Sequence, residues 1–138
     1  MVAISPCGLV TFLSPLWGGR ISDHEVTAQS ELLQGGMLED GDSVMADRSF
    51  DVEDLLAAKG VRMNIPAHLK GRAQLSRKDV EKTRRIAEIR IHVERAIGRV
   101  RNYDILNNSL PLSLAPIADD VVHVCFFLTN FDKPLVQY

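Results

Sequence analysis

Short apolar runs separated by turn residues alternate along the chain with longer segments of helical periodicity, which predicts strands interleaved with helices. Apolar runs at 2–4 and 9–13 flank a Ser-Pro-Cys-Gly turn, and this arrangement predicts a β-hairpin. Runs at 42–47 and 61–65 predict two further buried strands, the second of them stopped by Pro66. The hydrophobic pattern therefore indicates an α/β layer arrangement.

Helix-capping residues mark the start of the helices. Ser22 with Glu25 forms a capping-box signature for a helix at 23–33, and Asp51 can cap a brief helix that extends to Ala58. The longest helix is expected at 77–102. Its predicted buried stripe consists of Val80, Ile86, Ile89, Val93, Ile97 and Val100.

The pattern predicts one more helix near the C-terminus. Pro116 suits its first position because a proline lacks the N–H that would be unpaired there. Its apolar face would comprise Ile117, Val121, Val124, Cys125 and Leu128.

Length and composition are those of an ordinary soluble domain. With 138 residues, 46% hydrophobic and 25% charged, we expect a single domain spanning 1–138. The apolar runs near 9–13 and 121–128 are too short to span a membrane, so no membrane partner is expected. Cys7 and Cys125 have no metal-ligand spacing and are expected to be small buried thiols.

The net charge of −2 conceals an uneven distribution. Residues 1–60 contain ten acidic and three basic residues, whereas residues 70–101 contain eleven basic and four acidic residues. A basic half that faces a polyanion and an acidic half that binds cations would explain this asymmetry. A long exposed helix that alternates charges for solubility explains it equally well.

Two carboxylates are the best candidates for chemistry. Asp47 ends the predicted strand at 42–47, and ligand sites of open α/β sheets lie at that carboxyl edge. Spacing alone favours a simpler role, a turn aspartate that bonds its own backbone. Glu94 lies at the shoulder of the apolar stripe of the long helix, where Arg90, one turn earlier, could pair with it. Two such acids among cations suit divalent metals held against a nucleic-acid phosphate.

Short sequence motifs around these acids are similar to those of a known family. The matching motifs are Leu-Trp-Gly-Gly-Arg-Ile-Ser-Asp at 16–23, Ala-Asp-Arg-Ser-Phe at 46–50, Asn-Ile-Pro at 64–66 and Val-Glu-Arg at 93–95. The chain resembles the DDE superfamily endonucleases of the Harbinger-type transposase group from about Val2 to Val136. The resemblance implies that Asp47 and Glu94 are the second and third catalytic acids. Ser49 stands where the family usually has glycine.

The resemblance also implies a fold and a cofactor. We expect a ribonuclease H-like α/β domain, a mixed sheet with flanking helices, that lacks its first, central strand and the first acid carried on it. Asp47 and Glu94 would bind Mg²⁺ or Mn²⁺ and cleave DNA, with activity impaired by the missing acid. Edges left open in the sheet would favour self-association.

The partners follow from the same resemblance. Five basic residues would contact the DNA backbone: Lys70, Arg72, Arg77, Lys78 and Arg84. The family implies a nuclear location and a separate Myb-like DNA-binding partner. Two alternatives stay open, a non-catalytic transposase-derived module that binds DNA or protein, and a globular domain with no nucleic-acid role.

Overall fold

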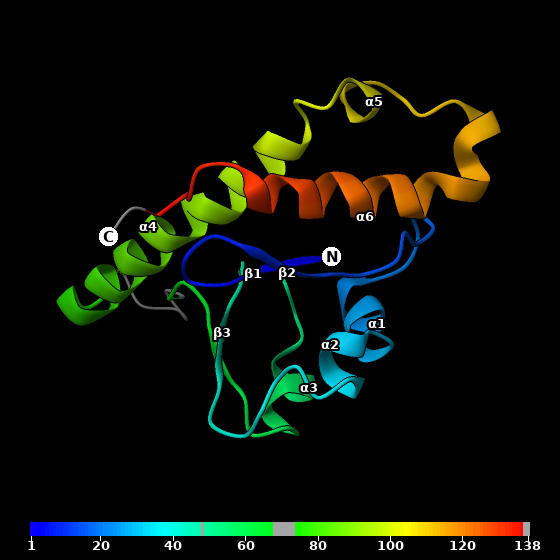
Figure 1. The fold of residues 1–138 in the computed structure, drawn as a ribbon. Helices are drawn as coiled ribbons and strands as arrows, with labels where there is room; N and C mark the ends of the chain where they lie inside the picture. Colours follow the sequence, from blue (N-terminus) through cyan, green and yellow to red (C-terminus); the bar gives the residue numbers. More distant parts are fainter. Residues whose placement is uncertain (48, 68–73, 137–138) are drawn as a thin grey trace. The chain divides into compact units, whose positions relative to one another are not determined.

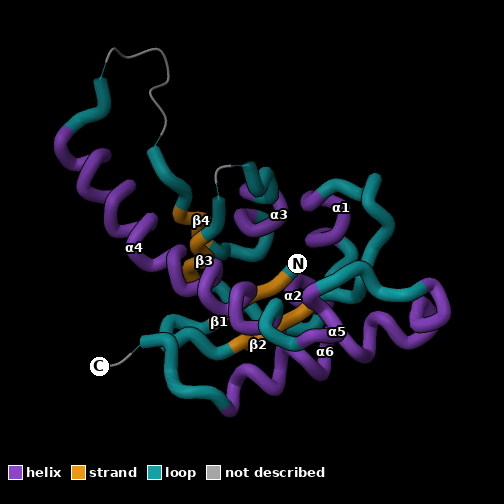
Figure 2. Tube along the Cα trace, turned by 90° about the horizontal axis from the view of Figure 1, so that it is seen from above, coloured by secondary structure: helices purple, strands orange, loops and turns teal. Residues whose placement is uncertain are grey.

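The computed structural model describes residues 1–47, 49–67 and 74–136, which combine helices with two small sheets (Figure 1). The α/β class expected from the sequence is confirmed at this level. The chain divides into two compact units. The hairpin unit comprises Met1–Gly19 and Ile91–Tyr138, and the parallel unit comprises Arg20–Arg90. Each unit contains one pair of strands, and Figure 2 shows both pairs.

The hairpin unit contains the predicted N-terminal hairpin. β1 (Val2–Ile4) pairs antiparallel with β2 (Val10–Leu13). The connecting turn is closed by a 2.8 Å hydrogen bond from the Gly8 N–H to the Ser5 carbonyl. Gly8 has a φ of 89°, which a side chain would strain, so the turn requires glycine at this position.

Polar side chains of the last helix bind β2 and the chain that follows it. This helix, α6 (Ala118–Leu128), runs beside the hairpin (Figure 1). The two ring nitrogens of His123 lie 2.9 Å from the Asp119 carbonyl and 3.2 Å from the Leu13 carbonyl. The Asp119 carboxylate accepts a hydrogen bond of 2.8 Å from the Leu16 N–H. The bonds to Leu13 and Leu16 attach α6 to β2 and to the chain that follows it.

Asn130 pairs with the edge of β2 as a neighbouring strand would. It lies in the short helix η2 (Thr129–Phe131), directly after α6. Its side-chain oxygen accepts the Val10 N–H at 2.8 Å, and its amide nitrogen donates to the Val10 carbonyl at 2.9 Å. Asn130 thereby satisfies both backbone groups of one edge residue of the hairpin.

The chain enters α6 differently from the prediction. After α5 (Asp104–Asn107), Pro116 lies inside the 3₁₀ helix η1 (Leu112–Ile117), and α6 begins only at Ala118. The placement of Pro116 at the first position of this helix is therefore wrong. Short 3₁₀ turns often precede α-helices, and here the turn accommodates the proline, which has no N–H to donate.

The apolar side of this helical region is largely exposed. Of the predicted apolar face Cys125 is buried, whereas Ile117, Val124 and Leu128 are exposed. By length and composition alone, the stretch Leu112–Phe131 is long and apolar enough to cross a membrane. The expectation that no apolar run reaches that length is therefore wrong for this stretch. Core helices of soluble proteins meet the same criterion, so it is weak evidence for a membrane segment.

The parallel unit begins with two short helices where the pattern predicts one. α1 (Asp23–Ala28) has the predicted cap, because the Ser22 hydroxyl accepts the Glu25 N–H at 3.1 Å. The chain becomes extended at Ser30 before α2 (Glu31–Gln34) begins. The buried Ser30 hydroxyl donates to the Thr27 carbonyl at 2.7 Å. Serine favours such a break because its side chain bonds nearby backbone groups.

The two internal strands of the prediction are present and pair with each other. β3 (Ser43–Met45) and β4 (Arg62–Asn64) form a parallel pair, connected through α3 (Glu53–Ala57). Val52, rather than Asp51, is the N-cap residue of α3. The position of Val52 is set by packing, because it belongs to the buried cluster of this unit. That cluster consists of Leu33, Val52, Leu56 and Val61.

The long helix α4 (Arg77–Val100) closely matches its prediction, and the boundary between the two units falls within it. The Ser76 hydroxyl accepts the Asp79 N–H at 3.2 Å and donates to its carboxylate at 2.7 Å, which caps the helix. Only part of the predicted stripe is buried. Ile86 and Val100 are buried, Val93 and Ile97 are partly buried, and Val80 and Ile89 are exposed.

Replacing Asn130 tests its attachment to β2. We expect Asn130→Ala to lower the free energy of unfolding by about 1–3 kcal/mol, because both Val10 backbone groups lose their partner. Urea denaturation would measure the change. Asn108→Ala is the matched control, since Asn108 is exposed and its side chain has no hydrogen bond among the described residues. The control should change stability by less than about 0.5 kcal/mol. Equal losses in both variants would contradict the role of Asn130.

The two cysteines lie in different environments. Cys125 is buried, and burial raises the pKa of its thiol. Cys7 is only partly buried, and the Ser5 hydroxyl, 3.0 Å from its sulfur, lowers the pKa of the Cys7 thiol. The expectation of buried thiols is thus confirmed for Cys125 and wrong for Cys7.

These differences predict the order of alkylation. Iodoacetamide should modify Cys7 before Cys125 in the folded chain, because the thiolate is the reactive form and Cys7 reaches it at lower pH. Peptide mass spectrometry at several pH values would measure both rates. Ser5→Ala should move the midpoint of the Cys7 profile to higher pH. A midpoint that stays in place would show that the hydroxyl does not act on the sulfur.

Candidate functional site

Asp47 lies at the carboxyl end of the parallel strand pair, as the sequence predicts. The Ala46 N–H donates to the Asn64 carbonyl at 3.2 Å, so the pairing continues to the residue before Asp47. The Asp47 carbonyl then accepts the Phe50 N–H at 3.1 Å, and the chain turns away from the sheet. The Asp47 side chain is 52% exposed. Its carboxylate is therefore accessible at the edge where α/β sheets bind ligands.

Arg90 of α4 holds this carboxylate. Its guanidinium nitrogen Nη1 lies 3.2 Å from Oδ1 of Asp47, and the Arg90 side chain is 29% exposed. Sequence reasoning considered Arg90 only as a partner of Glu94 on the same helix. The contact with Asp47 joins residues 43 positions apart in the sequence, and no local pattern could have indicated it.

A second polar contact joins α4 to the end of β4. The Thr83 hydroxyl accepts the Ala67 N–H at 3.1 Å. Thr83 and Arg90 are seven residues apart and therefore share a face of the helix, with the buried Ile86 between them. The part of α4 that belongs to the parallel unit is thus attached at two points to the chain that leaves β3 and β4.

Glu94 is exposed on α4 and belongs to the hairpin unit, whereas Asp47 belongs to the parallel unit. The structure places each acid within its own unit. Among the described residues, no group of three histidine, cysteine or acidic side chains is arranged to hold a metal ion. A common metal site of Asp47 and Glu94 stays a prediction.

The predicted DNA-contacting residues have different surroundings. Arg77 and Lys78 are exposed in the first turn of α4. Arg84 is also exposed, and its Nε lies 3.2 Å from the Glu88 carboxylate. Lys70 and Arg72 lie outside the described residues. Their contacts with DNA stay predictions.

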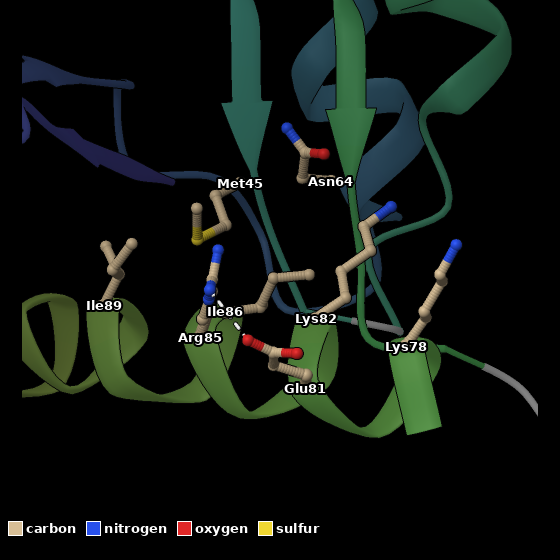
Figure 3. Close-up of a pocket in the computed structure, with 8 residues that line it drawn as sticks. All are labelled: Met45, Asn64, Lys78, Glu81, Lys82, Arg85, Ile86 and Ile89. Carbon is tan, nitrogen blue, oxygen red and sulfur yellow. Dashed lines mark hydrogen bonds and ion pairs between the residues drawn. The ribbon is translucent and has the colours of Figure 1, made fainter. Parts of the chain in front are cut away.

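A pocket of about 440 Å³ lies within the parallel unit, between α4 and the ends of β3 and β4 (Figure 3). Met45 and Asn64 line it from the strands. The side chains of Lys78 and Lys82 extend from α4 toward the strand ends. Sequence reasoning did not assign Lys82 to a site, and it considered Asn64 only as part of a family motif. The spacing of Lys78 and Lys82, one helical turn apart, was the signal that could have identified the lysine pair.

A comparison with protein families identifies the family of the chain. A family model described as DDE superfamily endonuclease matches residues 1–130. The chain belongs to the DDE superfamily endonucleases. No curated protein and no solved structure matches the chain. Both candidate acids, Asp47 and Glu94, lie within the matched region.

The ion pair should stiffen the turn that carries Asp47. We expect Arg90→Met to increase amide exchange at Phe50 about two- to fivefold, because a half-exposed ion pair contributes up to about 1 kcal/mol. Hydrogen exchange followed by NMR would measure it. Arg84→Met is the matched control, since its ion pair lies on the exposed surface of α4. An unchanged rate at Phe50 would show that Arg90 does not hold the turn.

Proposed function

We propose that this chain is a transposase-derived nuclease domain that cleaves DNA phosphodiester bonds with a divalent metal ion. The observation that supports it best is the position of Asp47. Its carboxylate is exposed at the carboxyl edge of β3/β4, in a chain that belongs to an endonuclease family. Glu94 is the proposed second metal ligand.

The residues present suit a metal held by few protein groups. Mg²⁺ is often bound through one or two carboxylates, with waters and substrate phosphates completing its shell, and Mn²⁺ accepts similar oxygen ligands. When bound, such an ion polarises the phosphate and activates the attacking water. Arg90 orients the Asp47 carboxylate, but its charge also opposes a cation there.

The finer features of the family belong to the same proposal. We assign the chain to the Harbinger-type group, with a ribonuclease H-like mixed sheet. A two-stranded parallel pair is too small to be stable alone, and parallel strands normally occur in larger, covered sheets. The β3/β4 pair therefore supports a larger sheet, and the edges that no further strand pairs with among the described residues would favour self-association. A nuclear location and a Myb-like DNA-binding partner complete the proposal.

A non-catalytic DNA-binding module is the second candidate function. Two observations favour it: Asp47 is already bound by Arg90, and the described residues contain no cluster of three metal-binding side chains. Such a module would bind DNA with strong salt dependence and without any need for a metal.

Nicking of supercoiled plasmid distinguishes the two functions. With Mg²⁺ or Mn²⁺, we expect nicking by the chain, lowered at least about 100-fold by Asp47→Asn and by Glu94→Gln, because each removes a metal ligand. Asp42→Asn is the control for Asp47, since Asp42 precedes β3 at its opposite end. Glu88→Gln is the control for Glu94.

The results of this experiment distinguish the nuclease from the non-catalytic module. Nicking that persists in Asp47→Asn, or that is lost equally in the control variants, would contradict the assignment of the acids. Salt-sensitive DNA binding without any metal-dependent nicking would replace the nuclease with the non-catalytic module.

A further inference from the structure

The pocket beside α4 combines a cationic rim with an apolar wall. Met45, Ile86 and Ile89 form the apolar wall, and Lys78 and Lys82 lie on the rim (Figure 3). Its volume of about 440 Å³ falls within the range of small-molecule sites. All of these residues belong to the parallel unit, and Met45 is only two residues before Asp47.

The charges of the pocket are not balanced. Its one carboxylate, that of Glu81, lies 2.8 Å from the Arg85 guanidinium and neutralises it. Lys78 and Lys82 have no ion pair among the described residues, although they lie one turn apart, where like charges destabilise a helix. The neighbouring pair of Arg84 with Glu88 shows the balanced alternative on the same helix. An anion bound between the two lysines would remove their repulsion.

The apolar wall indicates that the ligand has an apolar group in addition to its anionic group. Ile89 is 47% exposed although it is a large aliphatic side chain. A phosphate alone gains nothing from such a wall, whereas a nucleotide joins a phosphate to a flat base with apolar faces. The Asn64 amide nitrogen already donates to the Ser43 hydroxyl, and the amide oxygen can accept a hydrogen bond from the edge of a base. The pocket therefore matches a nucleotide better than a bare phosphate.

We propose that this pocket binds one nucleotide of an unpaired DNA strand, its phosphates on Lys78 and Lys82 and its base against Met45 and Ile89. The choice of DNA rests on the proposed function. Bases inside a duplex are stacked and cannot reach the wall, so the pocket selects a single-stranded or extruded nucleotide. Its place beside Asp47 would position an unpaired strand next to the proposed catalytic edge.

Fluorescence anisotropy of the full chain in EDTA tests the charged rim without any cleavage. The probes are a labelled single-stranded oligonucleotide and the duplex of the same sequence. We expect tighter binding of the single strand. The double variant Lys78→Gln/Lys82→Gln should weaken it and reduce the slope of log K against log salt by about 1.4, since each phosphate contact contributes about 0.7. Lys59→Gln, an exposed lysine before β4, is the control.

Variants of Ile89 test the apolar wall. Ile89→Tyr should strengthen single-strand binding about tenfold through stacking on a base, and Ile89→Asn should weaken it. A free mononucleotide should displace the oligonucleotide at concentrations where inorganic phosphate does not. The proposal would be overturned by equal affinity for both probes, by Ile89 variants that leave single-strand binding unchanged, or by displacement with inorganic phosphate alone.

The two proposals fail separately in these experiments. Loss of lysine-dependent binding while metal-dependent nicking persists would overturn the nucleotide pocket alone. Absence of nicking while Lys78, Lys82 and Ile89 still govern single-strand binding would overturn the nuclease and support the pocket.

Discussion

The attachment of α4 across the carboxyl ends of β3 and β4 is the constraint on which the candidate site depends. Arg90 binds the Asp47 carboxylate, Thr83 binds the Ala67 N–H, and Ile86 is buried between them. These contacts orient the exposed carboxylate and place the adjoining face of the helix over the strand ends. The lysine-lined pocket exists because of that placement. The Arg90 guanidinium that orients the Asp47 carboxylate also competes with any cation there. One interaction therefore both positions this carboxylate and weakens metal binding to it.

Each of the two units is stabilised by its own internal interactions. The parallel unit has an apolar cluster of Leu33, Val52, Leu56 and Val61, which packs α2 and α3 against the strand pair. The buried apolar residues of the hairpin unit are Val10, Phe12, Ala96, Val100 and Cys125. The hairpin unit also has polar bonds from the side chains of His123 and Asn130 to the backbone of β2. These bonds satisfy strand-edge groups that no further strand pairs with among the described residues.

Local chemistry made much of the fold predictable. The hairpin turn, the Ser22 cap and the length of α4 follow from neighbouring residues, and all three are confirmed. The errors arose where packing decides. Val52 replaced Asp51 as the cap of α3 because Val52 is buried in the core. Periodicity likewise placed Ile89 in a buried stripe, but the helix exposes it in the pocket.

The sequence by itself determined the family, the positions of the strands along the chain and the position of Asp47 at a strand end, because motifs and strand boundaries are encoded in adjacent residues. Only the tertiary structure decided the partner of Asp47 and the pocket beside it. Arg90 and Lys82 are far from β3 in the sequence and reach it only because α4 packs on the parallel pair. Contacts of that kind depend on the folded path of the chain, which local patterns do not specify.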